Sequence, residues 1–257
     1  MRTFSLALTI LIFFIIGIVL AGLILYPPLP VLVSSLASPE IQFAVILSIT
    51  TSTISTVVCV GIAIPAAYAL SRYSFPLKNL VNLILTVPLA LPPLVAGIAL
   101  LLFFGTTPWG RALEAWGFGV VFTPLGIIVA EVFVNLPYMI RILKSSYTAV
   151  NPRYENVAKT LGCTDSGAFL QVTLPLIRPG LIAGTTITWA KSMGEFGAVL
   201  MLAGATMMRT ETLPIALYLN ISTGDIDLAV AASVILILIS LAALCVVEYF
   251  SDEAHVF

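Results

Sequence analysis

The amino-acid sequence predicts an all-α integral membrane protein with six transmembrane helices. Hydrophobic residues make up 60% of the 257 residues and charged residues only 9%, with a mean hydropathy of +1.13. Soluble domains are about 45–50% apolar and about 25% charged, so this composition excludes a soluble fold. The apolar runs exceed the roughly 11 residues of a transmembrane β-strand and do not alternate, which favours helices. The net charge of -1 predicts no nucleic-acid partner.

The first three spans are predicted from long runs without charge, since a helix needs about 20 apolar residues to cross a bilayer. The first covers residues 4–26 and ends at Pro27, because a proline cannot continue a helix. The second and third cover 41–71 and 80–104. Prolines inside the third span predict that it is bent or broken.

The last three spans are predicted over residues 121–143, 178–204 and 228–249. The connections between spans are short, and the longest covers 144–177. No connection is long enough to hold a separate catalytic domain. The sequence therefore predicts one transmembrane domain over 1–257 with one sizeable loop.

Lysine and arginine counts near the span ends predict the orientation of the chain. With the N-terminus inside, two cations face outward, Arg111 and Arg209, and eight face the cytoplasm: Arg2, Arg72, Lys78, Arg141, Lys144, Arg153, Lys159 and Arg178. This excess predicts that both termini and the 144–177 loop are cytoplasmic. The expected location is the lipid bilayer of the cell membrane, crossed several times.

The sequence lacks the motifs of enzymes and of ATP-binding proteins. Its single histidine, His255, and its three cysteines show no metal-ligand spacing. No lysine follows a glycine, so a phosphate-binding loop is absent. We expect no catalytic residue, no metal site and no cofactor bound by this chain. Active transport would then draw energy from an ion gradient or from a partner subunit.

The 144–177 loop carries a regular local pattern. Asn151 is a favourable N-cap for an amphipathic helix over Tyr154–Leu161, and Gly162 is a suitable stop in a left-handed conformation. A second short helix is predicted from about 165 to 172. On composition alone, a loop that merely links two spans would account for this pattern.

The spacing within the loop resembles the EAA loop of ABC-importer permeases. Gly162 is followed by nine residues and then by Val172-Thr-Leu-Pro175, while the triplet reads Asn156-Val-Ala158, with Glu155 one residue earlier. The resemblance implies a coupling helix that seats in a groove of an ATPase subunit. The residues implied are Arg153, Tyr154, Glu155, Asn156, Ala158, Lys159, Leu161, Gly162 and Pro175.

Three other segments are similar to the sulfate and molybdate/tungstate branch of these permeases. They are Pro88–Gly97, Trp189–Ala198 (WAKSMGEFGA) and Arg209–Pro214 (RTETLP). The chain thus resembles the permease subunit of molybdate/tungstate ABC importers, in the binding-protein-dependent transport system inner membrane component family. The resemblance covers roughly residues 40–250 and implies a type I ABC-importer permease fold.

This resemblance implies a translocation pathway for a tetrahedral oxyanion, with molybdate or tungstate expected and sulfate or thiosulfate as the alternative. It also implies a homodimer, two ABC ATPase subunits that use ATP and Mg, and an extracytoplasmic oxyanion-binding protein. Two other classes remain open from the residues alone. One is an ion-coupled secondary transporter, although we find no internal repeat, and the other is a membrane enzyme.

Ionisable residues inside the predicted spans are candidates for the transport path, because such residues are costly in a membrane. Glu131 lies in the fourth span, while Lys191 and Glu195 lie in the fifth at i, i+4 spacing. They predict an intramembrane charge network. It would hold the helices together or, through Lys191, set the potential along an anion path.

A polar stripe in the fifth span is the second candidate for the path. Thr185, Thr188 and Ser192 share one helix face at i, i+3, i+7 spacing. Their hydroxyls suit an oxyanion, and small residues equally suit helix packing. The path and gate candidates are Pro92, Pro93, Thr185, Thr188, Lys191, Ser192, Gly194 and Glu195.

Overall fold

The computed structural model describes the backbone of residues 2–253 and the side chains of 4–245; His255 lies outside this part. The described chain contains helices and no strand, so the predicted all-α fold is confirmed. The helices are α1 (Arg2–Leu25), α2 (Leu29–Leu36), α3 (Pro39–Arg72), α4 (Lys78–Ala90), α5 (Pro93–Thr106), α6 (Pro108–Ala115), α7 (Pro124–Ala149), α8 (Arg153–Thr160), α9 (Asp165–Ala168), the π-helix η1 (Phe169–Thr173), α10 (Leu174–Leu176), α11 (Arg178–Met193), α12 (Gly197–Ala203), α13 (Leu213–Thr223) and α14 (Ile226–Glu253).

Four described helices, α1, α3, α7 and α14, are long and apolar enough to cross a membrane. Two bent helix pairs bring the candidate spans in the described chain to as many as six, if each pair is one span. The first pair is α4 with α5, and the second joins the 165–176 segment to α11. The predicted multi-span architecture is therefore confirmed.

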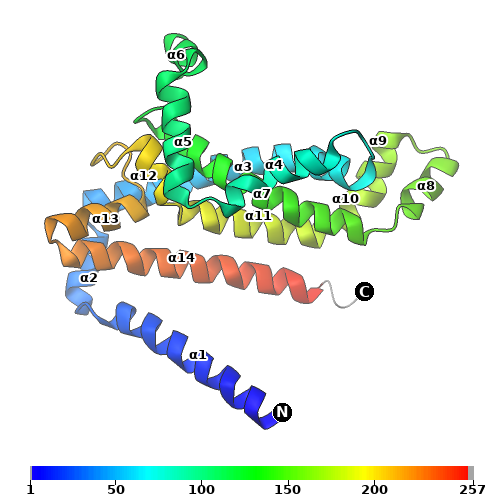
Figure 1. The fold of residues 1–257 in the computed structure, drawn as a ribbon. Helices are drawn as coiled ribbons and strands as arrows, with labels where there is room; N and C mark the ends of the chain where they lie inside the picture. Colours follow the sequence, from blue (N-terminus) through cyan, green and yellow to red (C-terminus); the bar gives the residue numbers. More distant parts are fainter. Residues whose placement is uncertain (1, 254–257) are drawn as a thin grey trace.

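Helices α3, α7 and α11 contact one another and form the centre of the bundle, with α14 packed along α11 (Figure 1). Buried small residues such as Ala63 and Ala67 of α3 let the helices approach closely. Helices α8 and α9 lie at one end of the bundle, and α2, α12 and α13 lie at the other. The bundle thus connects the loop that carries α8 to the opposite end of the molecule.

The third predicted span is broken, as its prolines indicate. Helix α4 ends at Ala90, α5 begins at Pro93, and the two axes differ by 112°. Pro92 is the N-cap residue of α5 and has an extended backbone. Two helices at this angle cannot form one straight crossing of a bilayer.

The fifth predicted span, 178–204, is wrong as a continuous helix. Helix α11 ends at Met193, and Gly194 is its C-cap residue. The Ala198 N–H donates a hydrogen bond to Glu195 Oε1 at 3.1 Å, which stabilises the first turn of α12. A side-chain acceptor at a new helix start therefore replaces the continuation of the old helix.

The two breaks lie against each other where α5 meets α12. A β-carbon placed at Gly197 would lie 2.8 Å from Pro93 Cβ and 3.0 Å from Leu94 N. One placed at Gly97 would lie 2.7 Å from Met201 Cβ. Glycine is needed at both positions because the two backbones are in direct contact.

Candidate functional site

Helix α8 is delimited by local signals that the sequence contains. The Arg153 N–H donates a hydrogen bond to Asn151 Oδ1 at 3.0 Å, and Gly162 has a φ of 95°. The left-handed stop is confirmed, and α8 covers Arg153–Thr160, one residue earlier at each end than predicted. Its N-cap residue is Pro152 and not Asn151, which lies one residue further out. The second predicted helix is longer than expected, because η1 and α10 continue α9 to Leu176.

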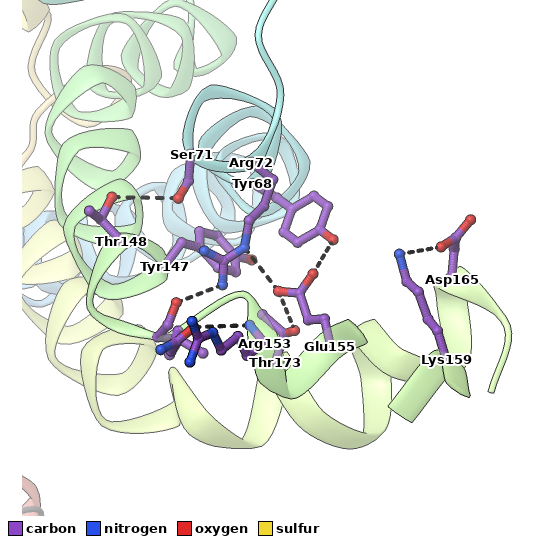
Figure 2. Close-up of polar contacts among 12 residues, drawn as sticks. Tyr68, Ser71, Arg72, Tyr147, Thr148, Arg153, Glu155, Lys159, Asp165 and Thr173 are labelled. Carbon is purple, nitrogen blue, oxygen red and sulfur yellow. Dashed lines mark hydrogen bonds and ion pairs between the residues drawn. The ribbon is translucent and has the colours of Figure 1, made fainter. Parts of the chain in front are cut away.

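Glu155 fastens α8 to the end of the bundle (Figure 2). Its side chain is buried, and its Oε1 accepts hydrogen bonds from Arg72 Nε at 2.9 Å and from Thr173 Oγ1 at 2.8 Å. Its Oε2 accepts a hydrogen bond from the Tyr68 hydroxyl at 2.9 Å. Arg72 also donates to the Val150 carbonyl at 3.0 Å. These contacts, the Glu155 anchor, join α8 to α3 and η1.

The Glu155 anchor holds a charged carboxylate. Burial by itself would raise the pKa of Glu155, but the hydrogen bonds from Thr173 and Tyr68 and the Arg72 guanidinium outweigh it and lower that pKa below its usual range. The carboxylate form is therefore the one that this cluster stabilises.

The outward face of α8 is apolar along one stripe. Tyr154, Val157 and Leu161 follow one another at i, i+3, i+7 and are 57%, 57% and 81% exposed. An exposed apolar patch of this kind marks a contact surface. Arg153, Asn156, Lys159, Gly162 and Pro175, which the sequence also singles out, are exposed too.

Two residues predicted for the coupling surface face inward instead. Glu155 and Ala158 are buried, on a face of α8 that adjoins the apolar stripe, about a quarter turn away. They anchor the helix and do not line its outer surface. Val157, the middle residue of the triplet, lies on the stripe, as its i, i+4 apolar spacing from Leu161 indicates.

A second buried polar cluster lies between α3, α7 and α11. Glu131 is 1% exposed, and its Oε1 accepts hydrogen bonds from Thr51 Oγ1 at 3.2 Å and Ser52 Oγ at 3.4 Å. One turn along α7, Asn135 Nδ2 donates to Ser192 Oγ at 3.0 Å. Ser55 Oγ donates to the same Ser192 oxygen at 3.4 Å. This Glu131 cluster joins α3, α7 and α11 through uncharged partners.

The predicted charge network of Glu131, Lys191 and Glu195 does not form as ion pairs. The two ion pairs within the described side chains are Arg72–Glu155 and Lys159–Asp165. Lys191 Nζ lies 5.2 Å from the centre of the Tyr138 ring. The i, i+4 pairing fails because α11 ends at Met193, so Glu195 is no longer on the same helix.

The predicted polar stripe of α11 divides between two environments. Thr188 and Ser192 are buried in the core, where Thr188 Oγ1 lies 3.6 Å from Met139 Sδ. Thr185 instead lines a groove of about 480 Å³ between α3, α11 and α14. In this structure two of the three hydroxyls therefore serve helix packing.

Comparison with known proteins places this arrangement in a transport family. The family model of the binding-protein-dependent transport system inner membrane component matches residues 59–253. The molybdenum transport system permease protein ModB of Mycobacterium tuberculosis is 40% identical over 206 residues, which cover 80% of this chain and 78% of that protein. The sulfate transport system permease protein CysW of Synechocystis sp. is 32% identical over 222 residues, covering 86% and 80%.

The fold is also found in a solved transporter. A crystal structure of a bacterial alginate ABC transporter, in complex with an alginate pentasaccharide-bound periplasmic protein, contains a chain that superposes with a TM-score of 0.73. The match covers 97% of this chain and 92% of that one, at 17% sequence identity. At such a low identity, the superposition shows a shared fold alone.

Proposed function

We propose that this chain, which belongs to the family of binding-protein-dependent transport system inner membrane components, forms the translocation pathway of an importer for molybdate. The chain is a multi-pass membrane permease subunit of an ABC importer. The observation that carries the choice of substrate is the 40% identity to a permease named for molybdenum transport. Tungstate, an oxyanion of the same tetrahedral shape, is expected to use the same pathway.

Sulfate is the second candidate substrate. The relative named for sulfate transport is 32% identical over most of this chain. Sulfate and molybdate carry the same charge and differ in size. A pathway that accepts one therefore differs from a pathway for the other in dimensions more than in chemistry.

We further propose that the apolar stripe of α8 seats against an ATPase subunit, which binds and hydrolyses ATP with Mg. Two copies of this chain would form the pathway and hold two such subunits. An extracytoplasmic binding protein would deliver the anion to the outer loops, around residues 105–120 and 206–226. The Glu155 anchor supports this assignment, because a helix that transmits motion must be joined firmly to the spans that move.

The contacts of α8 define a route for that motion. Displacement of α8 would pull on Arg72 at the end of α3 and on Thr173 in η1, which leads into α11. Helices α3 and α11 also contact each other and α7. A shift of the loop would therefore reach the three central helices together.

The proposed function is tested by transport into proteoliposomes that hold this chain, its ATPase subunit and the binding protein. We expect molybdate accumulation with ATP and no ion gradient, and none with a gradient and no ATP. The reverse result would identify an ion-coupled transporter. Competition by excess sulfate then ranks the two substrates.

The coupling surface is tested by co-purification of the ATPase subunit. Leu161→Asp should abolish it, because a charge replaces the most exposed apolar side chain of the stripe. Phe75→Asp is the matched control, since Phe75 is an exposed apolar residue outside α8, in the turn after α3. Equal retention of the ATPase by both variants would refute the assignment of α8.

A further inference from the structure

A groove between α4 and α7 carries positive charge that no acidic side chain balances. The groove has a volume of about 380 Å³, and its polar lining residues are Asn79, Asn82, Thr86, Arg141 and Lys144. The remaining lining residues are apolar. Among its lining residues there is no aspartate or glutamate.

The polar side chains come from two facing helices. On α4, Asn79, Asn82 and Thr86 lie at i, i+3, i+7 positions, which share one helix face. On α7, Arg141 and Lys144 lie at i, i+3 positions near the end that leads to α8. Because α4 packs on α7, the amide groups of one helix lie opposite the cations of the other.

One internal contact orients the lining. Lys144 Nζ donates a hydrogen bond to Asn82 Oδ1 at 3.1 Å. Since the amide oxygen of Asn82 is occupied in this way, its two N–H groups are the polar groups that it retains for a ligand. The groove therefore offers mainly hydrogen-bond donors.

The two cations lack a partner of opposite charge. Neither ion pair of the described side chains involves Arg141 or Lys144, and Arg141 is exposed. Arginine and lysine near the end of a membrane span extend to the interface, where dissolved anions and lipid phosphates can reach them. Two uncompensated cations beside amide donors suit an anion with several acceptor oxygens.

We propose that this groove is a binding site for a tetrahedral oxyanion. A water molecule occupies roughly 30 Å³ in the liquid, so the groove has room for a small anion and part of its hydration shell. Arg141 binds it through the guanidinium fork, Lys144 as a point charge, and the Asn82 amide as a neutral donor. The anion is either the transported one, which rests on the proposed function, or the phosphate of an anionic lipid.

Binding of sodium molybdate to the purified full-length chain in phosphatidylcholine nanodiscs tests whether the groove binds the transported anion. Arg141→Gln and Lys144→Gln should each weaken binding about tenfold or more, the loss expected for one charge-assisted hydrogen bond. Arg141→Lys should retain most of the affinity. Arg178→Gln is the matched control, because it removes an exposed cation at the start of α11, outside the groove.

Whether the groove binds the phosphate of an anionic lipid is tested with the same variants and phosphatidylglycerol. Lipid that co-purifies with the chain is counted, and its loss in the Arg141 and Lys144 variants, but not in Arg178→Gln, would assign the groove to a lipid phosphate. If neither molybdate nor phosphatidylglycerol binding changes relative to the control, the site is refuted. These readouts need neither ATP nor the ATPase subunit, so a failure of the proposed function would leave them interpretable.

Discussion

Two buried glutamates in this chain have different kinds of partner for their carboxylates. Glu155, where the α8 loop meets the bundle, is paired with Arg72 and receives two hydroxyl hydrogen bonds. Glu131, between α7 and α3, receives only hydroxyl hydrogen bonds, and its Oε2 has no hydrogen-bond partner. A charged pair fastens the loop, whereas uncharged groups join the helices that lie within the predicted spans.

The difference follows from where each residue lies. A cation at the end of α3 can reach the loop without entering the membrane interior, whereas a cation beside Glu131 would itself have to be buried there. Hydroxyls of α3 carry little cost in that position, because they can also bond to their own helix backbone. The two clusters are thus expected to respond differently to the same substitutions.

The largest effect is expected from Glu155→Ala. Breaking a buried ion pair leaves Arg72 without its carboxylate and costs about 3 kcal/mol, so α8 should detach and ATP-driven uptake should cease. Hydrogen exchange of the α8 amides and uptake into proteoliposomes measure both effects. Glu114→Ala, which removes an exposed acid on α6, serves as the control. Unchanged protection of α8 would contradict the anchor.

Glutamine substitutions sharpen the comparison. Glu131→Gln should cost less than about 1 kcal/mol, because an amide oxygen still accepts from Thr51 and Ser52. Glu155→Gln should cost about 2 kcal/mol, because it removes the charge that Arg72 pairs with. Thermal unfolding of both variants in the same detergent gives the ranking. An equal loss at the two positions would show that the charge of Glu155 is not what distinguishes them.

A smaller effect is expected on acidification. The pKa of Glu155 is lower in the folded protein than in the unfolded chain, so its stabilising contribution is complete above the unfolded value and is lost as the pH falls through the folded one. Protection of α8 should therefore be constant from about pH 7 to about pH 5 and decline below about pH 4. The Glu155→Gln variant should lack this decline. The same decline in that variant would assign it to another group.

The smallest effect is expected from Lys159→Ala. Lys159 pairs with Asp165 at the surface, and exposed ion pairs contribute little because water screens them. The unfolding midpoint should stay within error of the wild type. A clear decrease would mean that the surface pair, and not only the Glu155 anchor, holds α8 in place.

Much of the fold could be predicted because a membrane-spanning helix requires about 20 consecutive apolar residues, which a short stretch of sequence shows by itself. Long uncharged runs located α1, α3 and α14, and the prolines predicted the break between α4 and α5. The break between α11 and α12 was missed because it contains no proline. Its signal was Glu195, which stands three residues before Ala198 and accepts a hydrogen bond from its N–H, as a helix-capping side chain does.

The site was predictable only where its signals were local. Asn151 and Gly162 set the ends of α8, and the apolar stripe follows from helical spacing. The partner of Glu155 was out of reach, since Arg72 lies 83 residues away in sequence. The cationic groove was missed for the same reason, because Lys144 and Asn82 are separated by 62 residues.

The contact between α5 and α12 has a mechanical consequence. Gly197 against Pro93 leaves no slack between the two chain breaks, so they act as one joint rather than two. We therefore expect a rotation of α11 about its end at Met193 to be passed on to α5. The lever arm of that rotation is α5 together with α6, which project from the side of the bundle (Figure 1). If α8 moves as proposed, we therefore expect the displacement to be largest at the far tip of α6.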